Sequence, residues 1–291
     1  RIRIMKRIVF FDFEVASHGK IVDIGAIKSS GERFHSSIVN DFSKFISDSE
    51  YLCGHNILEH DIRFIEESVA KSHTLIDTLY LSPVLFPEKP YHKLVKDEKL
   101  LSEQLNNPLS DAQKAMELFH NEVDKFNSLS EKVKRGFYDL IGEDIHFKGF
   151  FDYCEYTSNR FSYLFNSKTD NISSILATEV CNKVNLSPII RNNPVELAYA
   201  IAIISTKDRY SLTPKWVRYK FPQVDNIIHL LRGINCHSKD CKYCQSHLES
   251  KVMLKRWFGY DNFRLFDGEP LQESAVNAAI NGKSLLAIFP T

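Results

Sequence analysis

The chain has 291 residues, of which 43% are hydrophobic, and its 37 basic residues balance its 37 acidic residues. That length suggests about two domains, and the apolar share is ample for buried cores. A net charge of zero argues against a strongly basic coat, so binding to nucleic acid would depend on local basic patches.

The sequence contains no run of about 18 apolar residues, so we expect no membrane span. Its first residues lack the apolar segment of a signal peptide. Six cysteines, three of them clustered, do not resemble a secreted disulfide framework. We therefore expect a cytoplasmic, reducing location.

The first feature along the chain is an apolar run, residues 8–11, that leads into two acids. We predict a buried strand with Asp12 and Glu14 on one face, because residues two apart on a strand point the same way. A buried acid pair needs a cation between its members, and a hard divalent metal is the natural candidate. The alternative is a strand end whose acids face water.

Two further acids stand at predicted helix starts. In residues 54–64 a polar loop turns into an amphipathic helix with Asp61 in its first turn, and residues 107–115 open another helix with Asp111 in its first turn. Residues 22–27 predict a second strand just after the first. Four carboxylates are thus placed on one strand and two helix starts.

In this order, Asp12, Glu14, Asp61 and Asp111 resemble the motifs of the DEDD exonuclease superfamily, over residues 5–125. The resemblance implies an α/β domain of the ribonuclease H type, in which these acids hold Mg²⁺ or Mn²⁺. It also implies a 3′→5′ exonuclease that acts on DNA and releases nucleoside monophosphates. In such two-metal sites the cations lower the pKa of a bound water and stabilise charge on the attacked phosphate.

The chain departs from that family at the general base. The family places a histidine five residues before the last aspartate, or a tyrosine four before it, where this chain has Asn106 and Asn107. An amide cannot take a proton from water at neutral pH, and losing a general base typically costs about 100- to 10,000-fold in rate. We select His92 as the replacement, with His55 and His60 as alternatives; each could instead be an ordinary surface or capping histidine.

Residues 126–235 are expected to form a mainly helical connector, including a buried helix over residues 196–204. Within the connector, residues 207–221 interleave cations with aromatic rings, which is typical of surfaces that bind single-stranded nucleic acid. The alternative is an amphipathic edge whose rings pack inward. The residues assigned to nucleic-acid binding are Lys215, Trp216, Arg218 and Tyr219.

Residues 236–250 predict a zinc knuckle. Cys236, Cys241 and Cys244 fall within nine residues, and His247 comes after them, which suits tetrahedral zinc. His247 is preferred as the fourth ligand by spacing, and zinc would fasten the helical region to the segment beyond the knuckle. The alternatives for the fourth ligand are His237, His229, Cys154 and Cys181, and the alternatives to a zinc site are a redox pair or free buried thiols.

Residues 251–291 resemble the opening segment of a RecQ-like superfamily 2 helicase motor, where an aromatic-glycine element and a glutamine contact adenine. The resemblance assigns this role to Tyr260 with Phe263 or Arg264, and to Gln272, although Gln272 stands further along the chain than in that family. Residues 285–289 predict an apolar strand. No complete phosphate-binding loop motif is present, so we expect ATP to bind only in a longer protein that includes the helicase domains. An ordinary helix-turn-strand is the alternative.

Taken together, these features predict the α/β nuclease part, helical connector and zinc knuckle of a nuclease–helicase that acts in DNA repair or in defence against foreign DNA, such as antiviral defence. One alternative is a degenerate nuclease fold that guides single-stranded DNA to the helicase. Another is a module that recruits protein partners.

Overall fold

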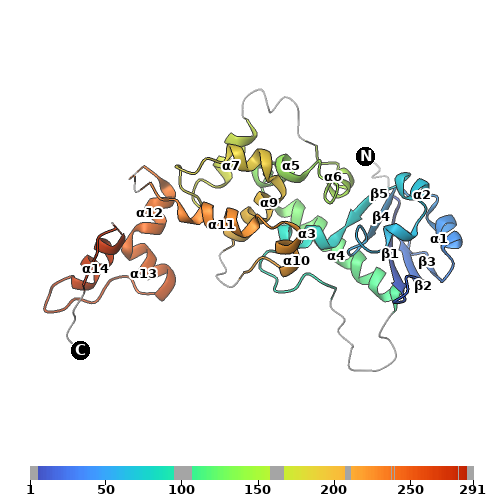
Figure 1. Ribbon diagram of the computed structural model, residues 1–291, viewed down its shortest axis with the longest axis horizontal. Coiled ribbons are helices and arrows are strands. Elements are labelled where there is room, and N and C mark those ends of the chain that lie inside the picture. Colours follow the sequence, from blue (N-terminus) through green and yellow to red (C-terminus); the bar gives the residue numbers. More distant parts are fainter. Residues whose placement is uncertain are drawn as a thin grey trace.

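The structure is a computed structural model that describes residues 6–94, 107–157, 167–206, 211–236, 238, 240–280 and 282–286. As expected, it is a mixed α/β fold with one five-stranded sheet and many helices (Figure 1). The strand order is β3-β2-β1-β4-β5. The strands are β1 (Ile8–Val15), β2 (Ile21–Lys28), β3 (Arg33–Ser36), β4 (Tyr51–Gly54) and β5 (Thr74–Asp77).

The central strand β1 is the predicted apolar strand, and β2 is the predicted second strand. β1 pairs antiparallel with β2 and parallel with β4, while β3 and β5 complete the two edges. The register places Asp12 opposite Gly25 and Glu14 opposite Asp23, and it shifts just after Glu14. The two acids therefore lie at the end of β1.

Each face of the sheet is buried by different helices. Val9, Phe11 and Phe13 belong to a core that includes Phe42 and Ile46 of helix α1 (Val39–Ile46). The alternate β1 residues, including Ile8 and Phe10, belong to a second core with helix α4 (Pro108–Ser128) and the helical region beyond it. Because side chains alternate along a strand, Asp12 and Glu14 continue the face that α4 covers.

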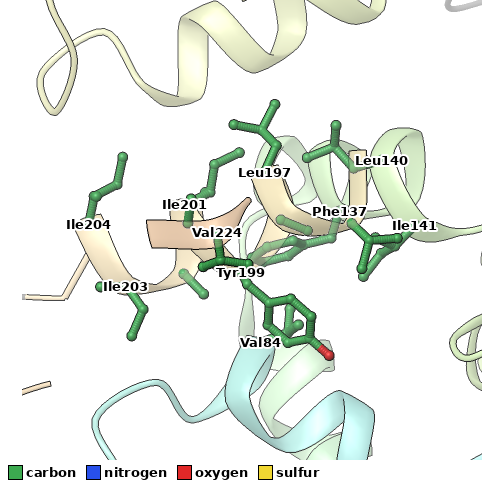
Figure 2. Close-up of a cluster of buried hydrophobic side chains, with 14 of the residues drawn as sticks. Val84, Phe137, Leu140, Ile141, Leu197, Tyr199, Ile201, Ile203, Ile204 and Val224 are labelled. Carbon is green, nitrogen blue, oxygen red and sulfur yellow. The ribbon is translucent and has the colours of Figure 1, made fainter. Parts of the chain in front are cut away.

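The second core extends without a break from the sheet into the helical region. Its centre is helix α9 (Pro194–Ile204), which is apolar all round and therefore buried on every side. Figure 2 shows α9 side chains between those of the neighbouring helices α3, α5 and α11. The helices of this region are α3 (Thr78–Leu85), α5 (Glu131–Ile141), α6 (Lys148–Tyr153), α7 (Lys168–Ile175), α8 (Ser187–Asn192), α10 (Lys215–Lys220) and α11 (Val224–Gly233).

Three helices form what we call the C-terminal arm: α12 (Lys242–Leu248), α13 (Ser250–Phe258) and α14 (Leu271–Ile280). α13 packs against α12 and α14, and the arm extends from the helical region on the side away from the sheet (Figure 1). Many of its apolar side chains are exposed, namely Val252, Trp257, Phe258, Tyr260, Leu265, Phe266, Leu271 and Val276.

Two predicted elements differ from the structure. The amphipathic helix expected in residues 54–64 is only a series of turns that ends in the short 3₁₀ helix η1 (Ile62–Phe64), and α2 (Glu67–Lys71) is a separate helix after it. The strand expected over residues 285–289 is not formed at Leu285 and Leu286, and the rest of it lies outside the described residues. None of the described helices has both the length and the apolar character needed to cross a bilayer.

Candidate functional site

The structure brings three of the four predicted carboxylates together. Asp12 and Glu14 from β1 and Asp111 from α4 each offer an oxygen, and these atoms all lie within 4.8 Å of one another. Asp12 and Glu14 are half-buried and Asp111 is buried. Such a set of carboxylate oxygens suits a hard divalent cation. The cluster could therefore hold a divalent ion.

Asp111 reaches the cluster because helix α4 begins directly on the sheet. Gly25 of β2, the partner of Asp12, leaves no room for a Cβ, which would overlap the main chain of Pro108 and Leu109. Asn107 caps the helix, its side-chain oxygen accepting hydrogen bonds from the amides of Leu109 at 3.1 Å and Ser110 at 3.2 Å. The sequence analysis missed Gly25, since its close approach to α4 leaves no local pattern.

The fourth predicted acid, Asp61, lies beside the cluster but in a different role. It is buried, and its Oδ1 accepts a hydrogen bond from the Phe13 amide at 3.1 Å. Burial raises its pKa to about 7, although the Phe13 amide opposes the shift. At neutral pH Asp61 is therefore partly protonated, and it is not among the three grouped acids.

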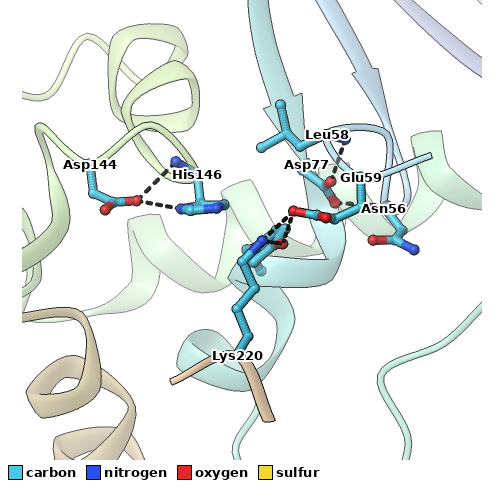
Figure 3. Close-up of polar contacts among 8 residues, drawn as sticks. Asn56, Leu58, Glu59, Asp77, Asp144, His146 and Lys220 are labelled. Atoms are coloured by element: carbon cyan, nitrogen blue, oxygen red, sulfur yellow. Dashed lines mark hydrogen bonds and ion pairs between the residues drawn. The ribbon is translucent and has the colours of Figure 1, made fainter. Parts of the chain in front are cut away.

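A further acid, Asp77, shapes the loop that carries Asp61. The Asp77 carboxylate accepts hydrogen bonds from the amides of Asn56 at 2.8 Å and Leu58 at 3.0 Å (Figure 3). It also accepts one from the Leu79 amide at 3.0 Å. Burial raises its pKa to about 6, against the effect of these amides. The sequence analysis missed this residue, although an aspartate between an apolar strand and a helix is a typical helix cap.

The grouped acids open into a cleft of about 640 Å³. Two exposed cations, Arg63 and Lys93, line it and could meet an anionic ligand. The lining residues are Asp12, Phe13, Glu14, Val15, His55, Asn56, His60, Asp61, Arg63, Phe64, Leu79, Lys93, Leu94 and Asp111.

His92, the selected general base, is buried next to the cleft rather than in its lining. Its Nδ1 lies 2.9 Å from the Ser82 hydroxyl, and burial lowers its pKa to about 4. The alternatives His55 and His60 both line the cleft. Asn106 lies outside the described residues.

His55 is held in one orientation. Thr78 donates its hydroxyl proton to the Gly54 carbonyl at 3.2 Å, so it can accept at 2.9 Å from Nδ1 of His55. That pairing leaves Nε2 with its lone pair, and this nitrogen is buried with no hydrogen-bond partner in the part of the chain that the structure describes. Burial lowers the pKa of His55 to about 4. His55 is therefore neutral at pH 7 and serves at least to fix the loop to α3.

Helix α10 carries all four residues that were predicted to bind nucleic acid, but their side chains point in different directions. Trp216 is half-buried, with its ring centroid 5.3 Å from that of Tyr80, so its ring packs inward. Tyr219 is 91% exposed and Lys215 is exposed. Arg218 forms an ion pair with Asp225 at 3.1 Å.

The last residue of α10 connects this helix to the loop of Asp61. Lys220 forms an ion pair with Glu59 and a hydrogen bond with the Tyr80 hydroxyl (Figure 3). The Lys220 ammonium lowers the pKa of Glu59. Nearby, the His146 ring lies 2.8 Å from Asp144. The helical region thus contacts the loop that carries Asp61.

The predicted adenine-contacting residues lie on the C-terminal arm. Tyr260, which comes after α13, is 67% exposed, and Gln272 near the start of α14 is also exposed. The arm lies at the opposite end of the molecule from the carboxylate cluster (Figure 1). The two predicted sites are therefore separate.

A second cluster consists of four cysteines, Cys181, Cys236, Cys241 and Cys244, whose sulfur atoms all lie within 4.8 Å of one another. The cluster could bind a metal such as zinc. Its fourth member is Cys181, one of the alternatives, and not the preferred His247. The ring nitrogens of His247 instead lie 3.1 Å from the Tyr243 carbonyl and 2.9 Å from the Arg256 guanidinium.

No protein-family model, curated protein sequence or solved structure matches this chain.

Proposed function

We propose that the α/β region is a metal-dependent 3′→5′ exonuclease of the ribonuclease H-like type that acts on DNA. The observation that carries the proposal is the grouping of Asp12, Glu14 and Asp111 within 4.8 Å in a cleft. The strand order β3-β2-β1-β4-β5 supports the fold assignment, because the β3–β2 and β2–β1 pairs are antiparallel and the β1–β4 and β4–β5 pairs are parallel. The direction of attack is taken from the DEDD resemblance.

The grouped acids would hold Mg²⁺ or Mn²⁺, whose bound form supplies an activated water and neutralises charge on the attacked phosphate. Asp61 would join them once it loses its proton. Arg63 and Lys93 would attract the strand to the cleft and hold its phosphates. On the exposed face of α10, Lys215 and Tyr219 would contact the strand further along, a cation for a phosphate and a ring for a base.

Proton transfer from water would fall to a histidine in or beside the cleft. The Nε2 atoms of His55, in the cleft wall, and of His92, next to the cleft, are both buried without a hydrogen-bond partner among the described residues. Neither stands where the DEDD family has its base. We therefore expect a slow enzyme, because the side chains described in the cleft offer only weak help in taking a proton from water.

The test is to incubate the protein with 5′-labelled single-stranded DNA and Mn²⁺ or Mg²⁺, beside Asp12→Asn. We expect a ladder that shortens from the 3′ end, and its loss in Asp12→Asn. Asp41→Asn is the matched control, because Asp41 lies in α1 on the other side of the sheet and pairs only with Lys44 at 3.0 Å among the described residues. Equal cleavage by the wild type and Asp12→Asn would refute the assignment.

A second candidate is a degenerate nuclease that binds single-stranded DNA without cutting it. The hydrogen bond between Asp61 and the Phe13 amide favours this candidate, as does the missing base. It predicts DNA binding with no cleavage in either metal. Fluorescence anisotropy with the same oligonucleotide separates it from a protein-recruitment module, which would not bind DNA.

The remaining proposals concern the rest of the chain. The cysteine cluster has soft thiolate ligands that suit Zn²⁺, and it would take no part in hydrolysis. Residues 251–291 are proposed to belong to a RecQ-like helicase motor, and the exposure of Tyr260 and Gln272 is compatible with contacts to adenine. A role in DNA repair or in defence against foreign DNA accompanies that proposal.

A further inference from the structure

The four-cysteine cluster is assembled from two parts of the chain that are far apart in sequence. Cys181 lies between α7 and α8 in the helical region, whereas Cys236 comes just after α11. Cys241 caps the start of α12, and Cys244 lies in its first turn. The cluster therefore sits where the C-terminal arm meets the helical region.

The sulfur spacing matches a tetrahedral metal site. The Sγ atoms of Cys236 and Cys244 are 3.7 Å apart, and those of Cys244 and Cys181 are 3.8 Å apart. Zinc bonds thiolate at about 2.3 Å, so two sulfurs on a tetrahedron are separated by about 3.8 Å. A disulfide requires about 2.05 Å, and none of the four cysteines is disulfide-bonded.

Main-chain amides point at the sulfurs in a repeated pattern. The Lys183 amide donates to Sγ of Cys181 at 3.4 Å, and the Ser238 amide donates to Sγ of Cys236 at 3.5 Å. Each donor is two residues after its cysteine. Such hydrogen bonds stabilise thiolates and orient them, as outer contacts do around metal ligands. Apolar packing of neutral thiols would not require them.

We propose that Cys181, Cys236, Cys241 and Cys244 bind one structural zinc ion that fastens the C-terminal arm to the helical region. Cys181 is the ligand that makes this a link, since it alone comes from the helical region before α11. Beside the cluster, the hydroxyl of the buried Tyr243 in α12 donates a hydrogen bond to the Arg232 carbonyl of α11 at 3.1 Å. This is a second contact between the arm and the helical region. The proposal is independent of the nuclease assignment.

The first test is the metal content of the full chain, purified under reducing conditions and analysed by elemental mass spectrometry. We expect about one zinc ion per chain. Replacing zinc with Co²⁺ should give the visible and near-ultraviolet bands of a tetrahedral site with four thiolates. The absence of zinc, with no uptake of either ion, would mean a packed group of thiols and overturn the proposal. A mass lower by two hydrogens would mean a disulfide and do the same.

Cys181→Ser identifies the fourth ligand. The variant should lose most of its zinc, or show a cobalt spectrum with three thiolates. Cys154→Ser, which removes a half-buried thiol outside the cluster, and His247→Ala should both keep the wild-type spectrum. Loss of zinc in His247→Ala but not in Cys181→Ser would refute the assignment. If Cys181→Ser does not fold, the thiolate count from the wild-type cobalt spectrum and the His247→Ala result decide the question.

Limited proteolysis tests the link itself. Removing zinc with a chelator should open the arm to trypsin, at sites such as Lys242 and Lys251, while the sheet and the helical region stay intact. An arm that stays equally resistant without zinc would refute the fastening role, whatever the metal content.

Discussion

At the scale of single residues, the cleft combines acids that titrate differently. Asp12, Glu14 and Asp111 are grouped around a possible cation position, whereas burial raises the pKa of Asp61 to about 7 and that of Asp77 to about 6. A buried acid with a raised pKa stabilises the fold only while it is protonated. At neutral pH the site therefore lowers the free energy of unfolding, and a bound cation would offset this loss.

The Asp61 pKa gives a prediction with a definite sign. Without metal, the folded protein keeps the Asp61 proton between pH 3.8, which is the ordinary pKa of this group, and about pH 7, whereas the unfolded chain loses it. The free energy of unfolding therefore falls as pH rises through that window. Asp61→Asn keeps the acceptor for the Phe13 amide and removes the titration. Thermal unfolding of metal-free protein should show Asp61→Asn more stable than the wild type near pH 8, by on the order of 4 kcal/mol.

Near pH 3 the difference should shrink toward zero, because Asp61 is then protonated in both the folded and the unfolded wild type. An Asn variant that is less stable at both pH values would contradict the burial-driven shift.

The close approach at Gly25 gives a second prediction. Gly25→Ala should destabilise the fold by about 1–3 kcal/mol, because the new methyl group overlaps the start of α4 and must push it away. The displacement should also weaken Mn²⁺ binding, because Asp111 moves with the helix. Urea unfolding and metal titration measure the two effects. Gly233→Ala, at an open position in α11, is the control that should lose neither stability nor metal.

At the scale of elements, α10 has a buried side and an exposed side. Trp216 packs near Tyr80 and Tyr199, with ring centroids 5.3 Å and 6.4 Å away, while Tyr219 faces solvent. The two interpretations of this segment, rings turned inward or rings that bind bases, thus apply to different residues of one helix.

Paired substitutions separate these roles. Trp216→Ala should lower the free energy of unfolding by about 2–4 kcal/mol through lost packing. Tyr219→Ala should change stability by less than about 0.5 kcal/mol and weaken single-stranded DNA binding roughly tenfold through lost base stacking. Urea unfolding and fluorescence anisotropy provide the two measurements. Unchanged DNA affinity in Tyr219→Ala would remove α10 from the proposed binding surface.

At the scale of the whole molecule, features set by local sequence could be predicted and features set by long-range contact could not. The strand with Asp12 and Glu14 and the buried helix α9 result from apolar patterns, and the structure contains both. The amphipathic pattern with Asp61 in its first turn gave only the short 3₁₀ helix Ile62–Phe64, while the Asp77 carboxylate holds the loop before it through the amides of Asn56 and Leu58. Spacing along the sequence could not single out Cys181 as the fourth cysteine, because it joins the cluster through the packing of segments that are far apart in the chain.

We propose that the cleft between β1 and α4 cuts DNA from its 3′ end, with cations held by Asp12, Glu14 and Asp111. The most direct test is to identify the product released from single-stranded DNA in Mn²⁺, by liquid chromatography and mass spectrometry, for the wild type and Asp111→Asn. The account predicts nucleoside monophosphates from the wild type and almost none from Asp111→Asn, with both proteins folded. No nucleotide release by a folded wild type that binds Mn²⁺, or equal release by both proteins, would contradict it.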